Sequence, residues 1–238
     1  MLSEHKGEIG FVGFAMVAYL VMASFDASQN FVYLAVIFGF FGLIIAWKLF
    51  EGVDDESAGY EKMTEIAEAI HEGAMVFLSR EYKILGYFIG GIFLLLLFLI
   101  SMQKGLWIGL WTAVSYAVGA GCSMLAGFFG MNAATTSGVR TSQAAVDGGQ
   151  PKALLVAFNG GAVMGLCVAS LGLVGVGGLF LLFGRGDSFT VLSGFAMGAS
   201  SIALFARVGG GIYTKTADVG SDLVGKVEAG IPEDDPRN

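Results

Sequence analysis

Long runs without a charged residue dominate the hydrophobic pattern of this sequence. They cover residues 31–47, 84–102, 105–139, 153–184 and 188–206. A helix rises about 1.5 Å per residue, so several of these runs exceed the hydrocarbon core of a bilayer, which is about 30 Å thick. The pattern therefore predicts an all-α fold, a polytopic transmembrane helix bundle.

The uncharged runs divide into five expected membrane spans and one shorter stretch. The shorter stretch, Ile9–Phe25, follows a charged start at residues 4–8. Residues 1–30 are therefore interpreted as either a removed signal peptide or an extra transmembrane helix, which makes five to six membrane helices in all. The five expected spans are Phe31–Phe50, Ile84–Met102, Leu106–Met131, Leu154–Phe183 and Phe189–Ala229.

The last span and two long links carry most of the charge. Phe189–Ala229 would form about 60 Å of helix, so its charged C-terminal half must protrude from the membrane or line a polar cavity. The longer links are Glu51–Lys83 and Asn132–Lys152. Apolar residues at helical spacing in the first link predict an amphipathic helix that lies on the membrane or on a neighbouring helix. These residues are Met63, Ile66, Ala67, Ile70, Ala74 and Phe77.

Composition supports the membrane class and indicates an orientation. The chain is 55% hydrophobic and only 14% charged, and its mean hydropathy is +0.72. The net charge of −7 argues against a nucleic-acid surface and suits a protein that recruits divalent cations. Lys104 and Arg185 flank two short loops, and the other side of the membrane has six basic residues and is expected to be cytoplasmic. Those six are Lys48, Lys62, Arg80, Lys83, Arg140 and Lys152.

Small residues are frequent inside the apolar spans. The pairs Gly86/Gly90 and Gly161/Gly165 have the GxxxG spacing that lets membrane helices approach closely. Cys122 and Cys167 also lie in apolar spans, and we interpret them as packing residues. The triplet 209–211 follows no strand and matches neither the dinucleotide-binding nor the P-loop pattern.

Charged residues near the end of the chain form the candidate chemistry. Asp218 and Asp222 are four residues apart, which places two carboxylates on one helix face, and Lys215 lies one turn earlier. Mg²⁺ commonly takes one or two carboxylates together with phosphate oxygens, and an ammonium can bind the same phosphate. From spacing alone, a solvated helix end supported by an Asp222–Lys226 pair is the favoured alternative. The membrane context and the resemblance below reverse that preference.

The C-terminal part of the sequence resembles the ion-translocating membrane pyrophosphatases. The segment ARVGGGIYTKTADVGSDLVGKVE (residues 206–228) is similar to the signature of that family, and IPEDDPRN (231–238) is similar to the loop that follows it. Weaker similarity occurs in EGAMVFLSREYK (72–83), AGFFGMNAATTSGVRTSQAA (126–145) and ALLVAFNGGAVMGL (153–166). Residues 31–238 are therefore expected to form the N-terminal part of a membrane pyrophosphatase domain. The resemblance implies a bundle of about sixteen helices per subunit.

The resemblance also implies roles for individual residues. It implies pyrophosphate as the substrate, Mg²⁺ as the cofactor, K⁺ as a candidate activator, H⁺ or Na⁺ as the pumped ion, and a homodimer. Arg207 matches an arginine in the ion-transfer path, and a salt bridge within the bundle is compatible with that role. Lys215 and Lys226 match substrate-binding lysines, Asp218, Asp222 and Glu233 match metal-binding residues, and Glu228 matches a supporting acid.

The resembling family continues beyond the last residue of this sequence into further acidic helices. The chain is therefore expected to be an N-terminal portion that supplies one wall of the active site, with no catalytic residue assigned within it. Because half of the ligands would be missing, this portion alone is expected to be inactive, and its under-paired aspartates would make the isolated bundle unstable. The alternative function is a non-catalytic ion channel or transporter module. A prokaryotic plasma membrane is favoured over an acidic organelle membrane, and the site is expected to face the cytoplasm.

Overall fold

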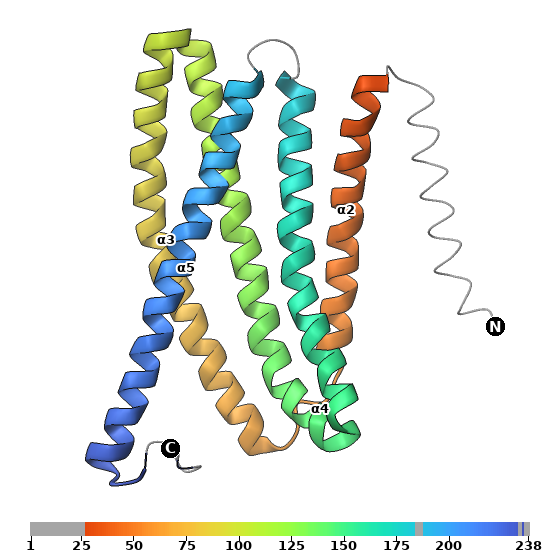
Figure 1. Ribbon diagram of the computed structural model, residues 1–238, viewed down its shortest axis with the longest axis vertical. Coiled ribbons are helices and arrows are strands. Elements are labelled where there is room, and N and C mark those ends of the chain that lie inside the picture. Colours follow the sequence, from red (N-terminus) through yellow and green to blue (C-terminus); the bar gives the residue numbers. More distant parts are fainter. Residues whose placement is uncertain (1–26, 184–187, 233–234, 236–238) are drawn as a thin grey trace, which may run out of the picture.

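The computed structural model describes residues 27–183, 188–232 and 235, and these residues are almost entirely helical (Figure 1). The elements are α2 (Ala27–Asp54), α3 (Glu61–Lys104), α4 (Leu106–Phe183), α5 (Ser188–Leu223) and a π-helical turn η1 (Val224–Glu228). No strand occurs in this described part of the chain. The predicted all-α class is confirmed.

Helix α4 is a hairpin of two helical arms. Gly149 has φ 68° and ψ −167°, a positive φ that glycine adopts readily because it has no Cβ. Pro151 follows, at a place where a new helix begins and its missing N–H is not needed. The two arms run in opposite directions from this turn (Figure 1). This corrects the expected long link over residues 132–152, because the first arm stays helical through most of it.

Four of the five expected spans lie within α2, α3 or α4, and the fifth, Phe189–Ala229, runs along α5 and η1 and ends one residue beyond them. Four helices of the described chain are long and apolar enough to cross a membrane, and α4 supplies two crossings because of its turn. Many large apolar side chains on the outer surface remain exposed, as expected of a protein whose surroundings are lipid or other helices. The protein is an integral membrane protein. The stretch Ile9–Phe25 lies outside the described residues.

The amphipathic segment of the first link is the N-terminal half of α3. Helix α3 continues without a break from Glu61 to Lys104, so this half does not lie flat on a membrane surface. Ala74 and Leu78 on its inner face are buried, and the ring of Phe77 lies 4.7 Å from the ring of Tyr213 on α5. Of the two alternatives, packing against a neighbouring helix is therefore the one that the structure adopts.

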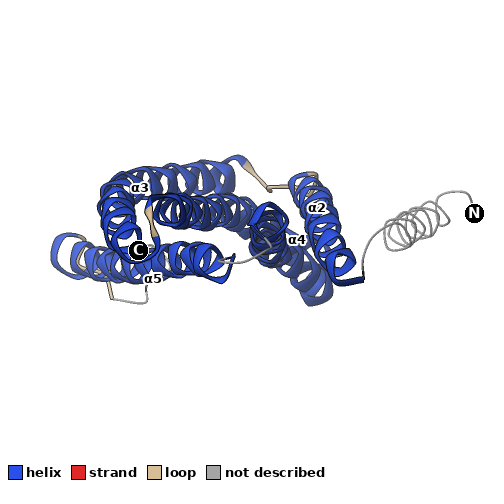
Figure 2. Ribbon diagram, turned by 90° about the horizontal axis from the view of Figure 1, so that it is seen from above, coloured by secondary structure: helices blue, strands red, loops and turns tan. Residues whose placement is uncertain are grey.

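Helix α4 lies at the centre of the bundle, with α2 on one side and α3 and α5 on the other (Figure 2). The first arm of α4 packs very closely on α5. A Cβ atom on Gly198 would overlap the carbonyl oxygen of Tyr116, and one on Gly119 would overlap that of Phe195. Glycine is needed at both positions because the two backbones touch there.

The glycine pairs that the sequence suggested are not the ones used in this contact. A Cβ atom on Gly86, Gly90, Gly161 or Gly165 would meet no atom of the described chain within 4 Å. These four glycines therefore face outward and do not join helices of the described chain. Cys122 and Cys167 are free thiols, half-buried and buried respectively, which agrees with packing roles.

A cluster of charged and carbonyl groups ties the α2–α3 loop to α4. We call it the Arg140 clamp. The Arg140 Nη2 atom lies 2.6 Å from Asp54 Oδ1, and its Nε atom donates to the carbonyl oxygens of Asp54 and Glu56 at 3.2 and 3.1 Å. Lys152 after the α4 turn lies 2.9 Å from the Glu56 carboxylate. The α2–α3 loop and the α4 turn are thus held together at one end of the bundle.

The same end of the bundle carries the charged half of α5 (Figure 1). At the opposite end, Lys104 donates a hydrogen bond of 2.7 Å to Thr190, which joins the end of α3 to the start of α5. Arg185 lies outside the described residues. The alternation of the helices therefore groups the α2–α3 loop, the α4 turn and the α5 terminus together, as the charge pattern predicts.

Candidate phosphate and metal site

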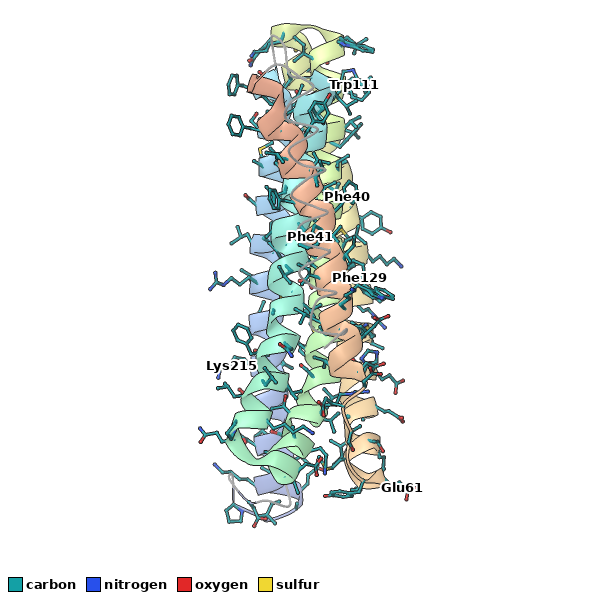
Figure 3. All side chains as sticks on the ribbon, turned by 90° about the vertical axis from the view of Figure 1, so that its right-hand side faces the viewer. Phe40, Phe41, Glu61, Trp111, Phe129 and Lys215 are labelled. Carbon is teal, nitrogen blue, oxygen red and sulfur yellow. The ribbon has the colours of Figure 1, made fainter. Side chains whose placement is uncertain are left out.

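The candidate site lies on the C-terminal half of α5. Arg207, Lys215, Asp218 and Asp222 all fall within its regular α-helical part. At 3.6 residues per turn they occupy an arc of about 80°. The side chain of Lys215 projects from the outer edge of the bundle, far along its length from Trp111 (Figure 3). The predicted charged stripe is therefore one accessible face of α5.

Lys215 and Asp218 form an ion pair on this face. The Lys215 Nζ atom lies 3.3 Å from Asp218 Oδ2, and the two side chains are 81% and 64% exposed. An exposed pair of this kind contributes little to stability, because water competes for both charges and both long side chains must be ordered. The pair leaves an ammonium and a carboxylate side by side and open to a ligand.

Asp222 stands one turn beyond this pair and is half-buried. It makes no hydrogen bond or ion pair within the described part of the chain, so the Asp222–Lys226 pair of the alternative interpretation, a solvated helix end, is not formed. The cause is the helix geometry. From Val224 the hydrogen bonds widen to i→i+5, as between the Ala229 N–H and the Val224 carbonyl at 2.9 Å, which rotates Lys226 away from the α-helical register.

The remaining predicted site residues lie in and after this π-helical turn. Lys226 and Glu228 belong to η1 and are exposed to solvent, close in sequence to the aspartates of α5. Glu233 lies outside the described residues. The structure therefore brings Lys215, Asp218 and Asp222 onto one face, and it places Lys226 on the same protruding end of the helix.

The two aspartates can contribute only part of a metal site. In residues 27–183, 188–232 and 235, no group of three or more histidine, cysteine or acidic side chains is close enough to hold a metal ion. Two carboxylates at i and i+4 nevertheless fit Mg²⁺, which retains water and substrate phosphate oxygens as its other ligands. The donor set therefore suits Mg²⁺ bound together with a phosphate.

Arg207 begins the polar part of the same face. It is exposed and makes no ion pair within the described chain, so the salt bridge considered for it is not formed here. It comes directly after the uncharged run 188–206, at the level where the apolar part of α5 ends. A cation at this point stands between the membrane-spanning part of the helix and the Lys215–Asp218 pair.

Sequence reasoning missed the support that α3 gives to this half of α5. Phe77 lies against Tyr213, and a Cβ atom on Gly73 would lie 3.2 Å from the Tyr213 hydroxyl. These contacts hold α5 two residues before Lys215. The amphipathic spacing of α3 predicted an apolar face, but it could not identify which helix would cover that face.

Comparisons with known proteins agree on one family. A family model described as inorganic H⁺ pyrophosphatase matches residues 40–238. The chain is 53% identical over 210 residues to a protein of Clostridium tetani that carries the provisional name of a K⁺-stimulated pyrophosphate-energized sodium pump. It is 46% identical over 210 residues to a protein of Methanosarcina mazei named as a K⁺-insensitive pyrophosphate-energized proton pump.

A protein of Pyrobaculum aerophilum with that same proton-pump name is 48% identical over 212 residues. Each of these alignments covers 88% of this chain, but only 29 to 30% of the relative. The chain thus spans about 30% of the length of the curated relatives that it matches. The identities are high enough to place it within one family with them.

Proposed function

Because the chain belongs to the inorganic H⁺ pyrophosphatase family, we propose that it forms part of an ion-translocating inorganic diphosphatase. The reaction is hydrolysis of Mg-pyrophosphate by one water molecule to two phosphates, coupled to the pumping of H⁺ or Na⁺. The observation that carries this proposal is the exposed Lys215–Asp218 pair, with Asp222 one turn away, at the end of a long membrane helix. This chain would supply one wall of the site, so activity has to be measured on the complete protein.

Lys215 and Lys226 bind the substrate phosphates in this proposal. Before substrate arrives, the Lys215 ammonium is held by Asp218 at 3.3 Å. Pyrophosphate offers that ammonium a more strongly charged partner, and a lysine can follow it because its side chain is long and flexible. The Asp218 carboxylate is then released on the side of the helix that Asp222 also occupies.

Asp218 and Asp222, with Glu233 from the following loop, would hold Mg²⁺. When bound, Mg²⁺ neutralises charge that develops on the phosphate oxygens and orients them for attack by water. Glu228 supports this acidic end of the site. Asp218 is exposed, and Asp222 is half-buried without a partner in the described chain, which suits residues that bind a cationic ligand rather than residues that hold the fold together.

Ion transport is assigned to the membrane part of the same helix. Arg207 lies in the ion-transfer path, where its charge opposes the back-flow of a cation. We place the site on the cytoplasmic side of a prokaryotic plasma membrane, since the six basic residues that mark that side lie at the same end. The functional protein is proposed to be a homodimer, and K⁺ is its candidate activator.

A passive channel or transporter module is the alternative function. A pore that only conducts ions has no need of a lysine beside two carboxylates, whereas a phosphate site does. The two functions differ in one simple respect. Only the diphosphatase releases phosphate from pyrophosphate.

The test measures phosphate release by membranes that carry the complete reading frame, with Mg²⁺. Lys215→Ala is expected to lower activity by about 100-fold, the usual effect of removing one group that stabilises transition-state charge. The matched control is Lys62→Ala on α3, which removes an exposed i, i+3 ion pair of 2.9 Å with similar exposure. The control should keep activity within about twofold. Wild-type membranes without activity, or equal activity in the two variants, would overturn the proposal.

A further inference from the structure

The contact between α3 and α5 contains one carboxylate among aromatic and glycine residues. Phe77 meets Tyr213 at 4.7 Å between ring centroids, and Phe88 meets Phe205 at the same separation. Between these two ring pairs, the Glu81 carboxylate lies directly against Gly209, where a Cβ atom would overlap Glu81 Oε1. Because residue 209 is glycine, the Glu81 carboxylate can lie directly against the α5 backbone, and a methyl group there would require this flexible side chain to shift.

Glu81 has no partner in the described chain for its charge. Its side chain is half-buried, and it makes no hydrogen bond or ion pair within residues 27–183, 188–232 and 235. The neighbouring Tyr82 fixes the rotation of α3, because its hydroxyl donates a 2.6 Å hydrogen bond to the Met124 carbonyl of α4. Tyr82 thus turns toward α4 while Glu81 turns toward α5. A half-buried carboxylate without a partner is partly removed from water, which costs free energy unless it binds something.

Glu81 lies beside α5 at a level between the candidate phosphate site and the apolar part of the bundle. Gly209 lies six residues before Lys215 and two after Arg207, so Glu81 is about 9 Å along the helix axis from the level of Lys215. It also lies just before the apolar run of α3, which begins at residue 84. Glu81 therefore stands between the candidate phosphate site and the entrance to the membrane-spanning part of the bundle.

We propose that Glu81 is a cation-binding carboxylate of the transport path, which takes up the H⁺ or Na⁺ that is moved when pyrophosphate is hydrolysed. The proposal rests on the function proposed above. An acidic group at the entrance of a membrane-spanning bundle raises the local concentration of cations, and Glu81 lies three residues before the apolar run of α3. Glu81 would bind the cation by its carboxylate oxygens, and the positive charge of Arg207, two residues before Gly209 on α5, would favour its release. Gly209 leaves room for the carboxylate beside the helix that carries the site.

The experiment measures hydrolysis and transport together in inverted membrane vesicles that carry the full reading frame. Proton uptake is followed with a pH-sensitive dye and sodium uptake with ²²Na⁺, so that the two arms identify the ion. Glu81→Gln is expected to retain at least about half of the hydrolysis and to lower the ions moved per pyrophosphate about fivefold or more, since it keeps the shape and removes the charge. Glu81→Asp should restore much of that ratio.

Two further variants separate this role from a structural one. Glu68→Gln removes an exposed carboxylate elsewhere on α3 and should leave both activities unchanged. Gly209→Ala keeps Glu81 but displaces its carboxylate, and it should lower the same ratio, so the test does not depend on one variant folding. An unchanged ratio in Glu81→Gln, or a parallel fall of hydrolysis and transport that aspartate does not rescue, would overturn the inference alone. Wild-type vesicles that do not hydrolyse pyrophosphate would overturn the proposed function and this inference with it.

Discussion

Two cation–carboxylate pairs lie at the same end of the bundle and differ in almost every physical respect. Arg140 and Asp54 are 2.6 Å apart, and the arginine side chain is only 18% exposed and also bonds to backbone carbonyls. Lys215 and Asp218 are 3.3 Å apart, and both are mostly exposed. The first pair has satisfied its donors and holds two helices together. The second pair is exposed and joins no other helix, so both of its charges are accessible to a ligand.

The difference shows why counting charged pairs is a poor guide to function in a membrane protein. A guanidinium with a rigid fork of donors can close the end of α2 against α4, because it bonds to carbonyl oxygens that the helix end leaves free. An ammonium offers a point charge that can change partners. The residue type and the degree of exposure together separate a structural clamp from a binding pair.

The largest expected effect on stability comes from breaking the Arg140 clamp. Arg140→Met should lower the free energy of unfolding by about 3 kcal/mol, because it removes the charged donor of the Asp54, Glu56 and Thr136 carbonyls. The measurement is denaturant unfolding of the full-length protein in detergent. Arg80→Met on the exposed face of α3 is the control. Equal stability of the two variants would show that the clamp is not structural.

A smaller effect is expected at the crossing of α4 and α5. Gly198→Ala adds a methyl group that overlaps the Tyr116 carbonyl oxygen, and it should destabilise the protein by about 1–3 kcal/mol. Gly161→Ala meets no atom within 4 Å, so it should be neutral or slightly stabilising by helix propensity, by up to about 1 kcal/mol. Thermal unfolding of both variants measures the two effects. A larger loss of stability in Gly161→Ala than in Gly198→Ala would contradict the packing described here.

The smallest effect on stability is expected from the Lys215–Asp218 pair itself. Lys215→Ala should change the free energy of unfolding by less than about 0.5 kcal/mol, as for other exposed i, i+3 pairs. The same variant is expected to lose activity. A large loss of stability would instead assign Lys215 to the structure, and it would remove the contrast with Arg140.

The sequence was sufficient to predict the helices but not their partners. Uncharged runs located all five spans, because a bilayer imposes length and apolarity on each crossing segment. The Gly86/Gly90 and Gly161/Gly165 pairs do not join helices of the described chain, because GxxxG spacing does not say which face another helix will cover. The glycines that carry the α4–α5 contact, Gly119 and Gly198, lie on different helices, and their proximity arises only in three dimensions.

The candidate site was predicted more fully than its surroundings. Lys215, Asp218 and Asp222 share a face because that part of α5 is a regular helix, which spacing alone predicts. The Asp222–Lys226 pair is not formed because the helix widens into a π turn at Val224, and the periodicity of the sequence does not indicate such a change. Glu81 was not found because its importance depends on its contact with Gly209, 128 positions away in the chain.

The central claim is that the exposed face of α5 binds a phosphate compound together with Mg²⁺. The most direct measurement is thermal unfolding of the full-length protein with Mg²⁺ and methylene diphosphonate, a pyrophosphate analogue that cannot be hydrolysed. A ligand at 100 times its Kd stabilises by about 2.7 kcal/mol. In wild type and Lys62→Ala, this stabilisation should appear as a higher Tm, and only when Mg²⁺ is present. Asp218→Asn should show no rise in Tm. An equal rise in Asp218→Asn, or none in wild type, would contradict the account.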